Sequence, residues 1–182
     1  MVRIQHSRPN IMLIKKKILK DEDIEYLVEQ SYNHKYGLGS VSKNGVTVED
    51  TSVRSAKVAP LLTPRSITSK FVDLLTRSGE YYCPETQFLL YEKGDKYAKH
   101  VDAIGENDPR AYTIITLIEK SDNLDGGTLK LWKRGSEPNT WQYRSVELEV
   151  GETVIFPSTM VHEVEEVKQG TRKVLVVWAH RV

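Results

Sequence analysis

The run TRKVLVVWAH, residues 171–180, is the last of seven strand-like stretches in the second half of this chain. Side chains alternate between the two faces of an extended strand. One face therefore carries an arginine, two valines and a tryptophan: Arg172, Val174, Val176 and Trp178. The six earlier stretches occupy residues 86–93, 111–120, 127–134, 140–150, 152–157 and 161–167. Many short strands, with turn residues and no helical pattern between them, indicate a β-sandwich or barrel.

Two helical patterns precede these strands. Residues 19–34 place apolar side chains at helical spacing behind Asp21, the expected N-cap, and residues 63–79 carry a second apolar stripe between Pro64 and Gly79. The intervening residues 37–55 predict a loop or an irregular hairpin that turns at Asn44-Gly45. We expect one domain over residues 1–182, in which a helical and loop preface (1–80) packs on one sheet of a mainly β jelly-roll core (81–182).

Composition excludes several classes of partner. With 26 basic and 25 acidic residues the net charge is +1, which predicts neither nucleic-acid binding nor a polybasic membrane contact. Cys83 is the only cysteine, so no intramolecular disulfide can form. The first residues lack the apolar stretch of a signal peptide, and no run approaches transmembrane length. We therefore expect a cytoplasmic protein; the sequence does not indicate an oligomeric state.

Three metal-binding side chains and an arginine suggest a function. His100 and Asp102 are two residues apart, so we expect them on one face of a strand, and His162 begins a later strand-like run. Two imidazoles and one carboxylate suit a redox-active iron with open coordination positions. Arg172, which follows the second histidine, can hold a small dicarboxylate beside that metal. The alternatives are ordinary polar residues on strand surfaces and, for Arg172, an edge charge paired with a glutamate.

Four blocks of sequence resemble one known family. They read YEKGDKYAKHVDA (91–103), RAYTIITLIEK (110–120), DGGTLKLW (125–132) and HEVEEVKQGTRKVLVVW (162–178). In this order they resemble the Fe(II)/2-oxoglutarate-dependent oxygenases of the prolyl-hydroxylase-like, PKHD-type family. The resemblance implies a cupin-like double-stranded β-helix. It also implies an enzyme that uses Fe(II), 2-oxoglutarate and O2, with ascorbate as an expected cofactor.

The resemblance also assigns roles to residues. It implies that His100, Asp102 and His162 hold Fe(II) and act in catalysis, and that Arg172 pairs with the distal carboxylate of 2-oxoglutarate. Tyr91 matches the family tyrosine that hydrogen-bonds this co-substrate, although a tyrosine half-buried in a sheet needs no such function.

Other positions are left more open. Where many relatives carry a second tyrosine, this chain reads Thr116-Leu117, so Thr113 and Thr116 become the candidates for that co-substrate contact. Trp178 shares the face of Arg172 and is either a pocket wall or a core residue. Tyr97 is interpreted as a packing residue, and the Gly126-Gly127 pair as a turn or a close backbone approach.

The resembling proteins predict hydroxylation of a prolyl residue in a peptide or protein, as in procollagen-proline 4-dioxygenases, with release of succinate and CO2. One alternative is a hydroxylase of a free amino acid or another small metabolite, and a second is a non-catalytic metal-binding jelly-roll module. Nucleic-acid demethylation is disfavoured, because the repair relatives carry a second arginine where this chain has Trp178. Residues Tyr36 to Lys57 are expected to form a mobile flap over the pocket.

Overall fold

The computed structural model describes residues 13–43, 46–75, 80–105 and 107–182. This part of the chain is mainly β, as the strand pattern predicted, with two helices before the long strands. The larger sheet has the strand order β1-β12-β8-β15-β6-β5-β2. Its strands are β1 (Ile14–Lys17), β2 (Gly37–Leu38), β5 (Lys57–Pro60), β6 (Tyr81–Tyr91), β8 (Arg110–Lys120), β12 (Glu152–Pro157) and β15 (Arg172–Arg181).

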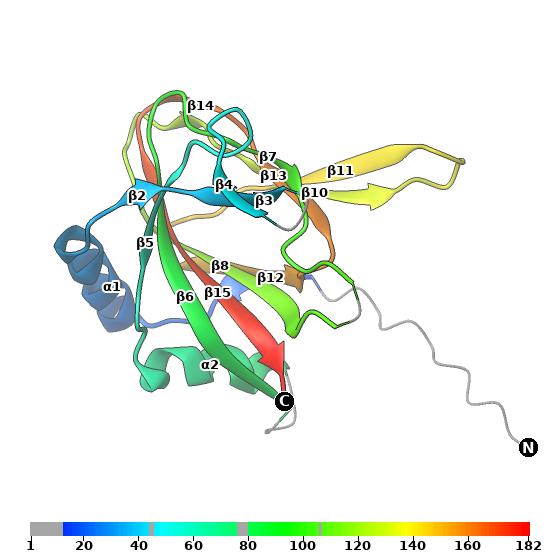
Figure 1. The fold of residues 1–182 in the computed structure, drawn as a ribbon. Coiled ribbons are helices and arrows are strands. Elements are labelled where there is room, and N and C mark those ends of the chain that lie inside the picture. Colours follow the sequence, from blue (N-terminus) through cyan, green and yellow to red (C-terminus); the bar gives the residue numbers. More distant parts are fainter. Residues whose placement is uncertain (1–12, 44–45, 76–79, 106) are drawn as a thin grey trace, which may run out of the picture.

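A smaller sheet faces the larger one, in the order β11-β10-β13-β7 (Figure 1). Its strands are β7 (Tyr97–His100), β10 (Leu129–Arg134), β11 (Trp141–Val146) and β13 (Val161–Val164). Two short pairs complete the fold: β9 (Asp125–Gly126) with β14 (Val167–Gln169), and β3 (Ser40–Lys43) with β4 (Val46–Glu49). Two facing antiparallel sheets of this kind form the expected jelly-roll.

The central strand β15 separates two hydrophobic cores. Val174 and Val176 point into the core between the two sheets. Leu175 and Val177 point into the core between the larger sheet and the helices. The alternation read from residues 171–180 is therefore confirmed. Each such side chain contributes about 1.5–3 kcal/mol by its removal from water.

The helices α1 (Asp21–Asn33) and α2 (Arg65–Leu75) cover the outer face of the larger sheet (Figure 1). The prediction of helices packed on one sheet is confirmed. Asp21 is the first residue of α1 and not its N-cap; Lys20 precedes it, and the Lys20 backbone N–H donates to Asp23 Oδ2 at 2.8 Å. Pro64 precedes α2, as expected, and Gly79 lies outside the described residues.

Several strand boundaries differ from the sequence-based expectation. The strand expected from residue 86 begins at Tyr81, and the run 161–167 is divided between β13 and β14. This run divides because β13 pairs with β10 and β7, whereas β14 pairs with β9. The sequence did not predict β1, at one edge of the larger sheet, or β5, which lies between β6 and the opposite edge strand β2. Such short strands depend on pairing partners that are distant in sequence.

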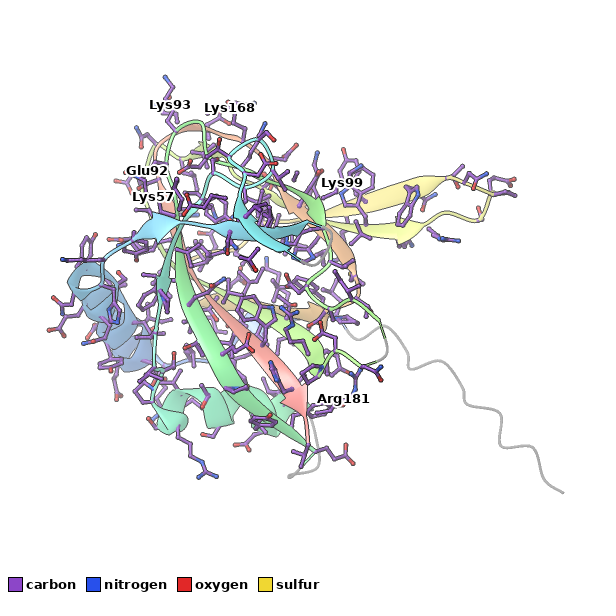
Figure 2. The ribbon with its side chains drawn as sticks, in the orientation of Figure 1. Lys57, Glu92, Lys93, Lys99, Lys168 and Arg181 are labelled. Carbon is purple, nitrogen blue, oxygen red and sulfur yellow. The ribbon has the colours of Figure 1, made fainter. Side chains whose placement is uncertain are left out.

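The segment between the helices contains more regular structure than its composition indicated. β2 and β5 join the larger sheet, and β3 and β4 form the predicted hairpin, in which Lys43 pairs with Val46. The turn residues Asn44 and Gly45 lie outside the described residues. Lys57 of β5 also forms an ion pair with Glu92, just beyond β6 (Figure 2). No helix among the described residues has the length and apolarity needed to cross a membrane.

Candidate metal centre

Two neighbouring strands of the smaller sheet position the two histidines. In the antiparallel pair of β7 and β13, His100 lies directly opposite His162, and their ring centroids are 4.1 Å apart. Side chains alternate along β7, so the neighbouring Lys99 lies on the outer face at the base of the β10–β11 hairpin (Figure 2). There the Lys99 Nζ is 3.3 Å from the centroid of the Trp132 ring. The histidines thus face the space between the sheets.

Asp102 completes the cluster from outside the strand. β7 ends at His100, so the expectation that both residues project from one strand is wrong. Asp102 lies in a bend that is fixed by the turn after β12, because the backbone N–H groups of Asp102 and Ala103 both donate to the Ser158 carbonyl, at 2.9 and 3.0 Å. Asp102 Oδ1 is 3.6 Å from His100 Nε2, and Asp102 Oδ2 is 3.6 Å from His162 Nε2. One ligand atom from each residue lies within 4.8 Å of the others.

Backbone carbonyls set the tautomer of both histidines. His100 Nδ1 lies 2.7 Å from the Ala98 carbonyl, and His162 Nδ1 lies 2.9 Å from the Met160 carbonyl. A carbonyl oxygen only accepts hydrogen bonds, so each Nδ1 carries the proton and donates it. Each Nε2 then presents its lone pair toward Asp102. Histidine ligands of protein-bound metals commonly show this arrangement.

The electrostatics keep the cluster in the protonation state that binds metal. Burial alone would raise the pKa of Asp102, but the two neighbouring histidines and the hydrogen bond from Thr113 hold this pKa well below its ordinary value. Burial lowers the pKa of His162 to about 4, and the charge on His100 acts in the same direction. Near pH 7 the carboxylate is therefore ionised and His162 is neutral.

Thr113 and Ser158 support the carboxylate. Thr113 Oγ1 donates to Asp102 Oδ2 at 2.6 Å and lies 3.0 Å from Ser158 Oγ. Thr113 thus lies at the site, where its contact is with Asp102, and its predicted contact with the co-substrate stays a prediction. Sequence reasoning missed Ser158, which follows the strand-like run 152–157 by one residue and carried no motif signal.

Thr116 does not reach the site. It lies on the face of β8 that packs toward the helices, together with Ile114 and Ile118, and its hydroxyl is 2.8 Å from Thr153 Oγ1. Leu117, one residue later, faces the core between the sheets. The prediction of Thr116 as a co-substrate contact is therefore wrong, because a one-residue step along a strand reverses the face.

Aromatic rings enclose the histidines. The Tyr97 ring stacks on His100, with centroids 3.5 Å apart and planes inclined by 13°. The Phe156 ring meets His162 edge-on at 4.9 Å. The interpretation of Tyr97 as a packing residue is too narrow, because the residue against which it packs is a ligand-type histidine. The sequence alone could not show which side chain the Tyr97 ring would contact.

A small cavity of about 40 Å³ opens at the cluster. Its wall includes Tyr91 and Trp178. Trp178 therefore lines the pocket and also packs against the core between the two sheets. The apolar part of the lining comes from Leu89, Ile115 and Val176. Such a lining limits water around a bound metal.

Arg172 is buried behind Tyr91. It is 6 % exposed, its Nη1 donates to the Gly127 carbonyl, and its guanidinium lies 5.3 Å from the centroid of the Tyr91 ring. No carboxylate of the described residues lies within ion-pair distance of it, which contradicts the alternative of a glutamate-paired edge charge. Burial lowers the pKa of Arg172 and raises the pKa of Tyr91 to about 12.

Gly127 makes this arrangement possible. Its φ is +66°, and a Cβ at this position would lie 3.0 Å from Arg172 Cδ and 2.9 Å from Val167 Cγ2. The Gly126-Gly127 pair was predicted to serve a turn or a close backbone approach, and the close approach is confirmed, because a Cβ on Gly126 would lie 2.2 Å from the Glu166 carbonyl oxygen. Arg172 also borders a second cavity of about 290 Å³, beside Gly127 and Leu117. Tyr91 contacts Arg172 and lines the metal cavity, so it connects the two regions.

Comparisons with known proteins agree with this geometry. The model of the 2OG-Fe(II) oxygenase superfamily matches residues 86–180. Two PKHD-type hydroxylases, from Prochlorococcus marinus and Hyphomonas neptunium, are 27% and 29% identical over 76% and 75% of this chain. The chain spans 60% and 55% of the length of these two curated relatives.

Solved structures share the fold at low identity. A Pseudomonas putida prolyl-4-hydroxylase superposes with a TM-score of 0.70 and 16% identity, covering 93% of this chain and 92% of that one. A Trichoplax adhaerens prolyl hydroxylase in complex with a hypoxia inducible factor peptide gives a TM-score of 0.71 and 18% identity, covering 93% and 83%. At such identities the likeness shows the jelly-roll fold alone.

Proposed function

This chain belongs to the 2OG-Fe(II) oxygenase superfamily, and from that premise we propose that it is an Fe(II)- and 2-oxoglutarate-dependent hydroxylase of a prolyl residue in a peptide or protein. The observation that carries the oxygenase part is the convergence of His100, Asp102 and His162 within 4.8 Å. We also propose that residues 1–182 act as a single domain, because α1 and α2 share a core with the larger sheet.

The residues present fit a divalent iron. Two imidazoles that donate through Nδ1 to backbone carbonyls, and the ionised carboxylate of Asp102, supply three ligands. Three protein ligands leave coordination positions open for other molecules. Thr113 and the two backbone carbonyls hold the ligand side chains in orientation, so little ordering remains to be done on metal binding.

The buried arginine fits 2-oxoglutarate. An unpaired guanidinium in a dry site is unfavourable unless an anion neutralises it, and Arg172 presents such a charge behind Tyr91. We propose that Arg172 pairs with the distal carboxylate and that the Tyr91 hydroxyl donates a hydrogen bond to it. At a pKa of about 12 this hydroxyl keeps its proton near pH 7 and remains a donor.

When bound, Fe(II) with 2-oxoglutarate and O2 supplies the oxidising power that hydroxylates a C–H bond, while 2-oxoglutarate is converted to succinate and CO2. The chain itself binds, orients and excludes water. Leu89, Ile115 and Val176 form an apolar wall beside the ligand cluster. The Tyr97 ring on His100 covers one side of that ligand.

Two arguments support a prolyl substrate. Relatives are PKHD-type hydroxylases by name, and one structure with the same fold is a prolyl hydroxylase in complex with a peptide fragment. Proline also suits the chemistry, because its fixed φ and ring present a C–H bond in a pre-set geometry. An extended peptide segment could enter along the cleft walls.

The test is turnover by purified protein with Fe(II), 2-oxoglutarate and ascorbate, which we propose as the reductant that keeps the iron ferrous. We expect succinate and a +16 Da product on proline-containing peptides, in equal amounts. Asp102→Ala should abolish both. Near-normal 2-oxoglutarate-dependent hydroxylation by Asp102→Ala would contradict the ligand assignment.

Two further outcomes would separate the alternatives. Turnover on a free amino acid or another small metabolite, without turnover on any proline peptide, would replace the prolyl assignment and keep the oxygenase. Metal binding without succinate formation on any substrate would favour a non-catalytic metal-binding module.

A further inference from the structure

A second buried arginine enters the metal cavity. Arg54 lies just before β5, is 8 % exposed, and lines the same cavity as His100 and Asp102. Its guanidinium carbon is 4.6 Å from the centroid of the Tyr97 ring, which stacks on His100. The Tyr97 ring therefore lies between Arg54 and the candidate metal ligand His100. The proposed function assigns it no role.

In the part of the chain that the structure describes, Arg54 forms no ion pair. Its Nε is buried without a hydrogen-bond partner, and its Nη1 donates to the Ser40 carbonyl at 3.3 Å, a contact that supplies no negative charge. Among the described residues no carboxylate lies within ion-pair distance of it. The Tyr97 ring stabilises a cation only modestly. A buried charge in this state is costly unless a ligand supplies the opposite charge.

The backbone around Arg54 fixes it in place without help from its side chain. The Ala98 N–H of β7 donates to the Val53 carbonyl at 2.7 Å, so the segment is fastened beside His100. Gly39 provides the space for the guanidinium, because a Cβ there would lie 2.5 Å from Arg54 Nε and 2.7 Å from Arg54 Cδ. Both features point to a positioned binding group.

We propose that Arg54 binds a carboxylate of the substrate that is hydroxylated. This inference rests on the proposed function and names a chemical class for its substrate: a molecule with an anionic group close to the reacting carbon. It differs from the proposed 2-oxoglutarate contact, because Arg172 contacts Tyr91 and Gly127, whereas Arg54 contacts Tyr97 and Ser40. Neutral amide carbonyls could accept its hydrogen bonds but would leave its charge uncompensated.

Two sources of this carboxylate are possible. It is either the α-carboxylate of a free amino acid or of a C-terminal residue, or the side-chain carboxylate of a residue beside the target proline. N-acetyl-L-proline and N-acetyl-L-prolinamide form a matched pair for the first source. The blocked dipeptides acetyl-Pro-Glu-amide and acetyl-Pro-Gln-amide form a matched pair for the second.

Binding can be measured by calorimetry on protein loaded with Mn²⁺ and 2-oxoglutarate, which avoids dependence on turnover. We expect one acid to bind roughly 10- to 100-fold more tightly than its amide, the range that loss of a charge-assisted contact produces. Arg54→Gln should remove this preference, and Arg54→Lys should restore part of it. Gly39→Ala should weaken the preference for the acid although the charge of Arg54 is retained, because the added Cβ would displace the Arg54 side chain. Arg144→Gln, a loss of charge on the exposed strand β11, is the control and should keep it.

Thermal unfolding and Mn²⁺ and 2-oxoglutarate affinities of each variant complete the test. Loss of the preference with both affinities unchanged supports the inference. An acid preference in neither pair, or one that survives in Arg54→Gln, overturns it. Equal loss of Mn²⁺ and acid binding in Arg54→Gln also overturns it, since Arg54 would then only position Tyr97 and His100. Failure of wild-type protein to bind Mn²⁺ and 2-oxoglutarate would reject the proposed function itself, and this inference with it.

Discussion

Each ligand-type side chain at the metal centre is held by a contact that leaves its coordinating atom free. The two histidines donate through Nδ1 to backbone carbonyls, and Asp102 accepts a hydrogen bond from Thr113 through one of its two oxygens. Arg172 is held in a similar way, by the Gly127 carbonyl and the Tyr91 ring. Preorganisation of this kind lowers the cost of ordering the site when a metal or an anion binds.

Removal of the Arg172 guanidinium should weaken 2-oxoglutarate binding. Loss of a charge-assisted contact costs about 1.5–3 kcal/mol, so Arg172→Ala should raise the dissociation constant of 2-oxoglutarate by about 10- to 150-fold. Arg172→Lys should recover only part of the lost affinity, because a compact ammonium replaces a guanidinium that can donate two parallel hydrogen bonds to a carboxylate. Calorimetry on the Mn²⁺-loaded protein measures both. An unchanged constant in Arg172→Ala would remove this residue from the co-substrate site.

The metal-free protein should lose stability on acidification below about pH 6.5. His162 has its folded pKa lowered from 6.5 to about 4, so between these values the unfolded chain binds a proton that the folded one does not. Stability is then complete above pH 6.5 and falls by about 3 kcal/mol as the pH falls to 4. Asp102, whose pKa is also lowered, adds a loss in the same direction below about pH 4.

Urea unfolding between pH 7 and 4 measures this dependence. His162→Gln should flatten the curve, whereas Leu62→Ala, at an exposed leucine without a titrating group, should leave its shape unchanged. A stability curve that is flat from pH 7 to 4 in the metal-free wild type would contradict the assignment to His162.

At the scale of elements, the pairing of β7 with β13 does most to build the site. It brings together two histidines that are far apart in the chain, and the turn after β12 adds Asp102 through the Ser158 carbonyl. The hairpin β3–β4 is connected to the cavity wall through Arg54, whose Nη1 donates to the Ser40 carbonyl. This hairpin pairs with neither main sheet.

The β3–β4 hairpin is the part of the expected flap, Tyr36 to Lys57, that we predict to move. Two strands alone are marginally stable, so its amides should exchange faster than those of β5, which pairs with both β2 and β6. Addition of Mn²⁺, 2-oxoglutarate and N-acetyl-prolyl peptides should slow exchange in β3–β4. The β10–β11 hairpin serves as the internal control. Equal exchange with and without these ligands would leave a passive surface loop.

At the scale of the whole molecule, the two hydrophobic cores have different roles. The core between the sheets surrounds the metal cavity. The core between the larger sheet and the helices, here called the outer core, stabilises the larger sheet, which is the platform behind that cavity. Lys173 fastens α1 to this platform: its ammonium donates to Ser31 Oγ at 3.0 Å and pairs with Glu119 at 2.8 Å. Truncation of a side chain in the outer core should therefore lower the free energy of unfolding more than it weakens ligand binding.

Leu175→Ala tests this separation. Leu175 is fully buried in the outer core, and such a truncation costs about 2–5 kcal/mol. We expect a lower free energy of unfolding with an unchanged Mn²⁺ dissociation constant for the folded protein. Leu62→Ala, at a leucine that is 93 % exposed, should change neither. A Mn²⁺ affinity that falls together with stability in Leu175→Ala would show that the two cores are coupled.

The sequence by itself determined the fold class, the two helices and the identity of the candidate ligands. These depend on local patterns: alternation along residues 171–180, helical spacing in residues 19–34 and 63–79, and ligand-type residues placed in recurring motifs. The glycine pair at 126–127 was also readable, because only glycine tolerates positive φ at little cost.

Only the tertiary structure decided which side chains meet. It placed Asp102 beyond the end of β7, turned Thr116 away from the site, and brought Ser158 and Arg54 to the cluster. The physical reason is that strand ends and register depend on partners far away in the chain, and a one-residue step reverses a side chain. A buried charge that forms no ion pair among the described residues, such as Arg54, becomes visible only when its burial and its neighbours are known.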